Sequence, residues 1–139
     1  MKKLVSLILA LILVVSLAAC GAPEETNPPK EFTPVSDGAV LGEGAVTFPL
    51  TITDKEGNSI NVTIHTDKET VGEALLEIGI VEGTMGDYGL YMTHVNGIPA
   101  IYEEDATYWA FYINGEYAMT GVDQTPIAQG ETYTLKVEK

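Results

Sequence analysis

Aromatic residues are the side chains of this sequence whose type and spacing could do chemistry. They are concentrated in the second half of the chain, where tyrosines surround the single tryptophan. Tyrosine supplies contact area and a hydroxyl at low entropic cost, as binding surfaces use it. The alternative is packing within a sheet, where aromatic residues are also enriched. The candidate ligand-binding residues are Tyr91, Tyr108, Trp109, Tyr112 and Tyr117.

Acidic residues supply the second candidate chemistry. Glu103, Glu104 and Asp105 are consecutive and could give oxygen ligands to Ca²⁺, but they lack the alternating pattern of a calcium-binding loop. His65 and His94 are isolated, and each is expected to be an ordinary strand residue. We therefore predict no metal site, with the acidic segment as the weak alternative and a solvated loop as its simpler interpretation.

The sequence contains no recognisable catalytic constellation. No Ser, Cys or Thr lies in a nucleophile motif, no glycine-rich loop matches a phosphate-binding pattern, and no two histidines have metal-ligand spacing. We predict that the protein is not an enzyme and has no catalytic residues.

The stretch from Tyr108 to Met119 positions most of the aromatic residues. Two β-rich runs are joined by Asn114-Gly115, which predicts a type I′ hairpin because both turn residues need a positive φ. Successive side chains of a strand point to opposite faces. One face carries Trp109, Phe111 and Ile113 and the other carries Tyr108, Ala110 and Tyr112, so the strand is apolar on both faces. Trp109, Phe111 and Ile113 are expected mostly in the core, and Tyr108, Tyr112 and Tyr117 are expected to be exposed.

The first 44 residues are predicted to be targeting and linker sequence. Residues 1–19 have a charged start, an apolar run and a small-residue end, which is typical of a secretory signal peptide and too short for a transmembrane helix. Leu-Ala-Ala-Cys-Gly resembles the bacterial lipobox, so Cys20 is the predicted lipid attachment site. Residues 20–44 are rich in proline and glutamate and predict a disordered linker. The protein is then expected at the cell membrane, lipid-anchored and facing outside the cytoplasm.

The charge of the chain limits its partners. The formal net charge is −13, and it becomes more negative when the two lysines of the signal peptide are removed. A surface of this sign repels phosphate backbones and anionic lipid headgroups, so we predict no nucleic acid as partner. The acidity is also explained simply by the solubility of a secreted domain.

Residues 45–139 are predicted to form one small α+β domain. Alternating apolar and polar residues predict strands, whereas Thr70 and Glu73 form a capping box that begins a short amphipathic helix. A glycine-rich connection is expected to follow this helix. The expected fold is β-grasp-like, with the helix packed across a mixed sheet. Its elements are strands at Val46–Thr53, Ser59–His65, Leu90–Val95, Ile98–Tyr102, Tyr108–Ile113 and Thr132–Val137, and a helix at Thr70–Ile78.

Five segments resemble a known family. They are Thr70–Leu76, Tyr88–Tyr91, Val95–Gly97, Tyr108–Glu116 and Gly130–Tyr133. The pattern resembles the bacterial domain of unknown function 4430 (DUF4430), often found in lipoproteins, over essentially all of residues 45–139. That family is similar in turn to the C-terminal β domain of transcobalamin and intrinsic factor. In those carriers the β domain covers one face of cobalamin, and a separate helical barrel holds the other face.

These observations together predict a cell-surface lipoprotein with a small ligand-binding domain. The resemblance implies cobalamin or a related corrinoid as the ligand, although no cofactor is certain. One alternative is a protein-interaction or adhesion module of the cell envelope, and another is a metal-binding surface protein. A corrinoid site predicts a concave aromatic face, an adhesion module predicts a flat face or an open sheet edge, and a metal site predicts clustered carboxylates.

Overall fold

The computed structural model describes residues 32–139, and these form one compact unit. The predicted signal peptide, Cys20 and the first part of the predicted linker lie outside the described residues. The compact unit begins at Phe32, within the residues predicted as linker. Phe32 and Val35 pack against the core, and the Asn96 side-chain amide hydrogen-bonds both the N–H (2.8 Å) and the carbonyl (3.0 Å) of Val35.

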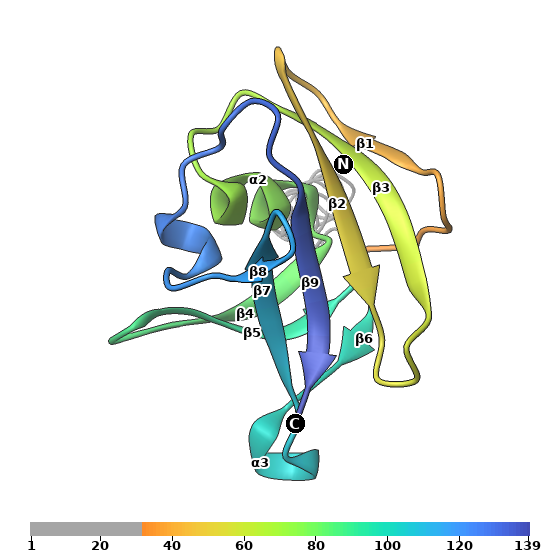
Figure 1. The fold of residues 1–139 in the computed structure, drawn as a ribbon, viewed down its shortest axis with the longest axis vertical. Coiled ribbons are helices and arrows are strands. Elements are labelled where there is room, and N and C mark those ends of the chain that lie inside the picture. Colours follow the sequence, from red (N-terminus) through yellow and green to blue (C-terminus); the bar gives the residue numbers. More distant parts are fainter. Residues whose placement is uncertain (1–31) are drawn as a thin grey trace, which may run out of the picture. The chain divides into compact units, whose positions relative to one another are not determined.

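The larger of two sheets has six strands in the order β1-β3-β2-β9-β7-β8 (Figure 1). The hairpin of β2 and β3 joins β9 in parallel, and β9 in turn pairs antiparallel with β7. The short strand β1 pairs in parallel with β3. The bounds are β1 Val40–Gly42, β2 Val46–Thr53, β3 Ser59–Thr66, β7 Tyr108–Ile113, β8 Glu116–Tyr117 and β9 Tyr133–Glu138.

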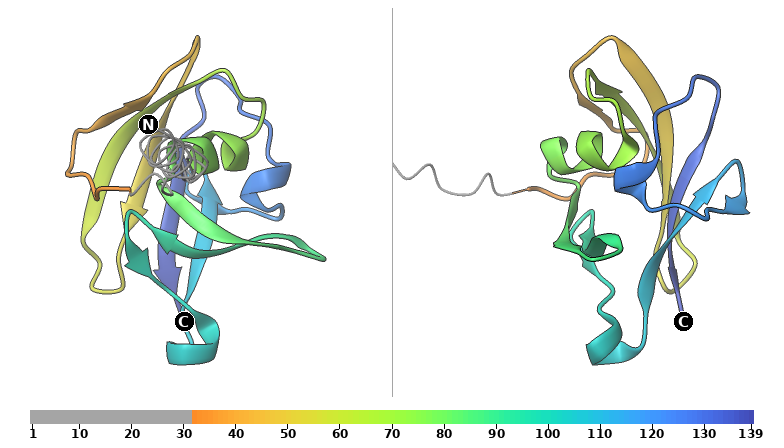
Figure 2. Two further views of the ribbon diagram at one scale, coloured as in Figure 1. Left: turned by 180° about the vertical axis from the view of Figure 1, so that it is seen from behind. Right: turned by 90° about the vertical axis from the view of Figure 1, so that its left-hand side faces the viewer.

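A second layer covers one face of this sheet. It contains helix α2 (Val71–Ile78) and a small antiparallel sheet of β4 (Val81–Gly86), β5 (Gly89–Val95) and β6 (Ile98–Pro99). Figure 2 shows that no described element lies over the opposite face of the large sheet. The predicted α+β class with one main helix packed against a sheet is confirmed, whereas the single mixed sheet is in fact two sheets.

Helix α2 forms for the local reasons that its sequence predicts. The Thr70 side chain accepts a hydrogen bond from the Glu73 N–H, and the Glu73 carboxylate accepts one from the Thr70 N–H, which completes the capping box. Gly79 ends the helix with φ of 88° and donates its N–H to the carbonyls of Leu75 and Leu76. The buried face of α2 has Val71, Ala74 and Leu75.

The predicted hairpin turn forms as expected, but two predicted connections differ in the structure. Asn114 and Gly115 both have positive φ, 51° and 81°, as the type I′ turn requires. The glycine-rich connection after α2 is strand β4, which pairs with β5 in an antiparallel ladder. The sequence did not predict this strand, because glycine has a low strand propensity. The acidic segment is not a loop but the short helix α3 (Tyr102–Asp105), which ends where Ala106 donates its N–H to the Tyr102 carbonyl.

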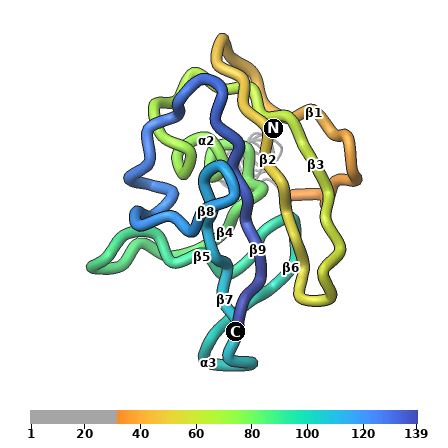
Figure 3. The backbone as a smooth tube through the Cα atoms, in the orientation of Figure 1, coloured from red at the N-terminus to blue at the C-terminus, as the bar shows by residue number. Residues whose placement is uncertain are grey.

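The core lies between the two layers. Alternate residues of the large-sheet strands point inward, among them Phe48, Leu50, Leu135 and the fully buried Tyr133. The Tyr133 ring meets Phe48 edge-on at 5.3 Å between centroids and stacks on Phe111 at 5.9 Å. The opposite face of the sheet is exposed or half-buried except at Thr53 and Ala110, and it carries mainly threonine, tyrosine and other polar side chains. Figure 3 follows the backbone through both layers.

Candidate functional site

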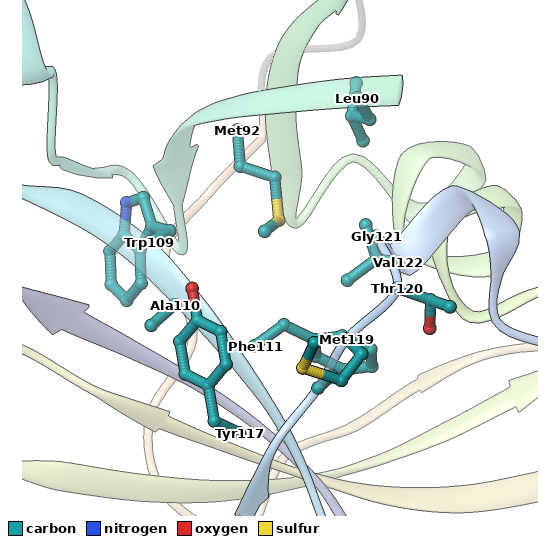
Figure 4. Close-up of a pocket in the computed structure, with 11 residues that line it drawn as sticks. Leu90, Met92, Trp109, Ala110, Phe111, Tyr117, Met119, Thr120, Gly121 and Val122 are labelled. Carbon is teal, nitrogen blue, oxygen red and sulfur yellow. The ribbon is translucent and has the colours of Figure 1, made fainter. Parts of the chain in front are cut away.

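A groove of about 340 Å³, lined mainly by apolar side chains, lies between β5 and the edge of the large sheet that β7 and β8 form. Figure 4 shows its side chains around an open space, contributed by β5, by β7, by β8 and by the segment that follows β8. Ligand pockets of this kind combine an apolar lining with a few polar groups. The lining residues are Leu90, Met92, Trp109, Ala110, Phe111, Tyr117, Ala118, Met119, Thr120, Gly121 and Val122.

Strand β7 supplies the rigid wall of the groove. Trp109 and Phe111 are only 5% and 6% exposed, so their rings are held mostly by the core. The Trp109 Nε1–H donates a hydrogen bond of 3.2 Å to the Ile98 carbonyl, which ties β7 to β6 in the small sheet. This part of the groove is therefore preorganised.

The opposite rim is exposed and apolar. Met119 is 95% exposed and Tyr117 is 56% exposed, although both line the groove. Large apolar side chains left in water are uncommon enough to indicate contact with another molecule when they gather around a groove. Methionine is also an adaptable contact residue, because its unbranched side chain fits irregular shapes.

Asp123 holds two walls of the groove together. It lies in the short 3-10 helix η1 (Val122–Gln124), and its Oδ1 accepts a 3.1 Å hydrogen bond from the Leu90 N–H of β5. A Cβ atom at Gly89 would lie 2.9 Å from the same Oδ1, and one at Gly121 would lie 2.8 Å from it. The lack of a side chain at both positions therefore makes room for the carboxylate. On the other side, a Cβ at Gly72 of α2 would meet the Asp123 backbone at 2.7 Å.

Three of the predicted ligand-binding tyrosines form a cluster on the exposed face of the large sheet. The Tyr117 ring packs edge-on against Tyr112 at 5.6 Å between centroids, so Tyr117 links this cluster to the groove. The Tyr112 hydroxyl donates a 2.8 Å hydrogen bond to Glu138, which raises the pKa of Tyr112 and lowers the pKa of Glu138. Burial, with Tyr117 next in effect, raises the pKa of Tyr108. The hydroxyls of Tyr108 and Tyr112 therefore stay protonated at neutral pH.

The fifth predicted tyrosine lies apart from the groove. Tyr91 is on β5 between the groove residues Leu90 and Met92, so its side chain points to the other face of the small sheet. Its hydroxyl donates to Glu103 Oε2 at 3.2 Å and accepts the Tyr102 N–H at 3.1 Å. Tyr91 thus holds α3 in place.

The acidic segment is engaged in local hydrogen bonds. Asp105 accepts hydrogen bonds from the Thr107 hydroxyl and from its N–H, and the hydroxyl in particular lowers the pKa of Asp105. Within residues 32–139, no three His, Cys, Asp or Glu side chains come together in a way that could hold a metal ion. His65 and His94 are partly exposed strand residues that contact threonine hydroxyls.

The structure therefore divides the predicted ligand-binding set. Trp109 and Tyr117 line the groove, Tyr108 and Tyr112 lie beside Tyr117 on the exposed face, and Tyr91 belongs to neither place. The sequence interpretation missed Leu90, Met92, Met119 and Val122, which complete the groove. The alternation along residues 90–92 indicates that Leu90 and Met92 share one face of their strand. Nothing in the sequence, however, shows that β5 lies next to β7.

Comparison with known proteins identifies the family. The domain of unknown function DUF4430 matches residues 68–139. The chain belongs to this family. No curated protein matches it.

Solved structures share its fold, and two examples follow. A protein from Ruminococcus gnavus ATCC 29149, described as a candidate metal-binding protein, is 26% identical with a TM-score of 0.63, and the match covers 68% of this chain and 98% of that one. Haptocorrin in complex with Cbi is 16% identical with a TM-score of 0.53, over 68% of this chain and 25% of that one. The chain thus corresponds to about a quarter of haptocorrin, and at this identity the likeness concerns the fold alone. The predicted family and the predicted transcobalamin-like fold are confirmed.

Proposed function

We propose that this protein is a lipid-anchored domain outside the cytoplasm that binds a small ligand in the groove and catalyses no reaction. The observation that carries this proposal is the combination of a buried aromatic wall, Trp109 and Phe111, with an exposed apolar rim, Tyr117 and Met119. A rigid wall lowers the ordering cost of binding, and the rim leaves water when the ligand arrives. The predicted lipobox at Cys20 supplies the anchor.

The groove favours a flat, uncharged ligand that offers both apolar surface and hydrogen-bonding groups. Its lining has no charged side chain, and its polar side chains are only those of Tyr117 and Thr120. A corrinoid is the most concrete candidate, because the fold is shared with haptocorrin, which was solved in complex with Cbi. The volume of about 340 Å³ is at the lower end of ligand pockets, so a large ring would be covered on one side only. The partial cover agrees with a domain that holds one face of its ligand.

A metal is the second candidate ligand. The description of the Ruminococcus gnavus relative, whose whole length matches this chain, favours it. Against it, the carboxylates of Glu103 and Asp105 are already hydrogen-bonded to Tyr91 and Thr107. The acidic segment would have to give up these contacts to coordinate an ion.

Equilibrium dialysis of residues 32–139 against cobinamide and cobalamin tests the proposal. This fragment contains the whole compact unit and its core, and so is expected to fold alone. Variant Met119→Ala removes an exposed rim side chain without opening the core, whereas Tyr88→Ala removes a tyrosine that is 99% exposed but lies outside the groove lining. Binding at micromolar concentration or tighter, weakened by Met119→Ala and unchanged by Tyr88→Ala, is the expected result.

Other outcomes would overturn parts of this proposal. Uptake that Met119→Ala leaves unchanged would place the ligand elsewhere on the domain. The absence of uptake at high micromolar concentration would exclude autonomous corrinoid binding. A parallel titration with Ca²⁺ and Zn²⁺, followed by the thermal midpoint, tests the metal alternative, since a metal that binds only the folded state raises that midpoint.

A further inference from the structure

The edge of β7 that faces the groove is only partly covered by a neighbouring strand. The two-residue turn at Asn114-Gly115 makes Ile113 and Glu116 a hydrogen-bonded pair, so Ile113 directs its backbone groups toward β8. The Asn114 N–H donates to the carbonyl of Thr132, which directly precedes β9. Backbone groups of the even-numbered residues of β7 therefore point toward β9. Backbone groups of the odd-numbered residues of β7 therefore point away from β9.

Strand β8 covers too little of this edge to satisfy those groups. Its ladder with β7 is limited to Tyr112–Tyr117 and Ile113–Glu116, followed by one hydrogen bond of 2.9 Å from the Ala118 N–H to the Phe111 carbonyl. Beyond Ala118 the chain turns away toward η1. Along the described chain, the Trp109 N–H and carbonyl thus have no strand beside them, whereas Ala118 lies opposite Phe111. Both Trp109 and Phe111 line the groove.

Groups of this kind are the ones that an added strand pairs with. An extended antiparallel peptide beside Trp109 would exchange two backbone hydrogen bonds with it. The peptide residue opposite Trp109 would share its face and project toward Met92 and Val122, whereas its neighbours would project toward Tyr108 and Tyr117. The groove therefore suits alternating apolar and hydroxyl-bearing side chains.

The charge around the groove selects a basic peptide. No lysine or arginine is among the lining residues, while Glu116 precedes Tyr117 and Asp123 follows Val122 in the chain. The whole chain carries a formal charge of −13. An extended segment with lysine or arginine at its ends would be attracted, and an acidic segment would be repelled.

We propose that the free edge of β7 binds an extended, basic segment of a partner protein by strand addition in the groove. This proposal does not depend on a corrinoid or on any other small ligand. Short, open edges are otherwise protected in natural sheets, and β8 protects only the half of this edge next to the turn.

Nuclear magnetic resonance of ¹⁵N-labelled residues 32–139 tests the proposal with the peptide Lys-Val-Thr-Val-Thr-Val-Lys. Binding is expected to shift the backbone amide signals of Trp109 and of nearby Phe111, and to slow deuterium exchange at Trp109, because the Trp109 N–H gains an acceptor. Edge strands β1 and β4 in the same sample serve as internal comparators. Two matched peptides complete the set: one with N-methyl groups on its valines, and one with glutamate in place of both lysines.

The N-methylated peptide is expected to bind about fivefold more weakly, because it loses the N–H that donates to the Trp109 carbonyl, a hydrogen bond that contributes about 1 kcal/mol. The acidic peptide is expected to bind more weakly still at low salt, with a difference that shrinks at high salt. Equal binding of the parent and N-methylated peptides, no change at Trp109 and Phe111 at millimolar peptide, or changes confined to β4 would each overturn strand addition at β7. Equal binding of the acidic peptide would overturn the assignment of a basic partner.

Discussion

Replacement of Trp109 by alanine is expected to lower the free energy of unfolding strongly, because this groove residue is almost entirely buried. Trp109 is 5% exposed, packs in the central core and donates its Nε1–H to the Ile98 carbonyl. Truncation of a buried tryptophan to alanine costs about 3–5 kcal/mol, a large part of the total of about 5–15 kcal/mol for a small domain. At roughly 4–8 °C per kcal/mol, a loss of about 3 kcal/mol lowers the thermal midpoint by roughly 12–24 °C.

Urea unfolding followed by far-ultraviolet circular dichroism measures this loss. Fluorescence is unsuitable, because Trp109 is the only tryptophan of the chain. Trp109→Phe keeps a ring but loses the hydrogen bond to Ile98, so it is expected to cost less than the alanine variant. Met119→Ala, at an exposed position, is the matched control and is expected to change stability by less than about 0.5 kcal/mol. A cost below about 1 kcal/mol for Trp109→Ala would refute its place in the core and would make that variant a usable probe of binding.

Three further predictions concern the helix cap, the groove walls and the exposed tyrosines. Thr70→Ala removes the capping box of α2 and is expected to cost about 0.5–2 kcal/mol in urea unfolding, whereas Thr70→Ser, which keeps the hydroxyl, should cost much less. Asp123→Ala leaves the Leu90 N–H without its acceptor, so it is expected to cost about 1–3 kcal/mol of stability and to speed deuterium exchange at Leu90. Asp123→Asn keeps an acceptor oxygen and is expected to be about as stable as the wild type. Equal losses of stability in both variants would show that the charge of Asp123, not its hydrogen bond, holds the groove walls together. The hydrogen bond from Tyr112 holds the pKa of Glu138 below its usual value, so its contribution to stability is present above the usual carboxyl pKa and is lost as the pH falls through the lowered one. The difference in free energy of unfolding between wild type and Tyr112→Phe should therefore be largest near pH 7 and shrink toward pH 3, and a difference independent of pH would contradict this assignment.

The local turns and caps of this domain could be predicted because a few adjacent residues decide them. Asn114 and Gly115 adopt the positive φ angles that a type I′ turn needs, and Thr70 and Glu73 complete each other's hydrogen bonds within one helical turn. The alternation along β7 likewise separated the buried Trp109 from the more exposed Tyr108 and Tyr112.

Pairings between distant segments could not be predicted in the same way. Strand β1 forms only because residues 40–42 align in parallel with β3 more than twenty residues later, and β4 forms only because β5 lies beside it. Neither segment has a strong strand pattern of its own, since glycines occupy Gly42, Gly83 and Gly86. Parallel and cross-sheet contacts are decided by packing of the whole chain rather than by propensity.

The candidate site shows the same division between local and distant information. The sequence by itself determined that aromatic residues are concentrated on one hairpin and that the chain is acidic, because composition and period-two alternation are local properties. Only the tertiary structure decided which of them share a groove, since β5, β7 and η1 meet there from separate parts of the chain. The tertiary structure also decided that one edge of β7 is partly open, because β8 ends after two residues. Which backbone groups of a strand stay unpaired depends on the neighbouring strand, not on the strand's own sequence.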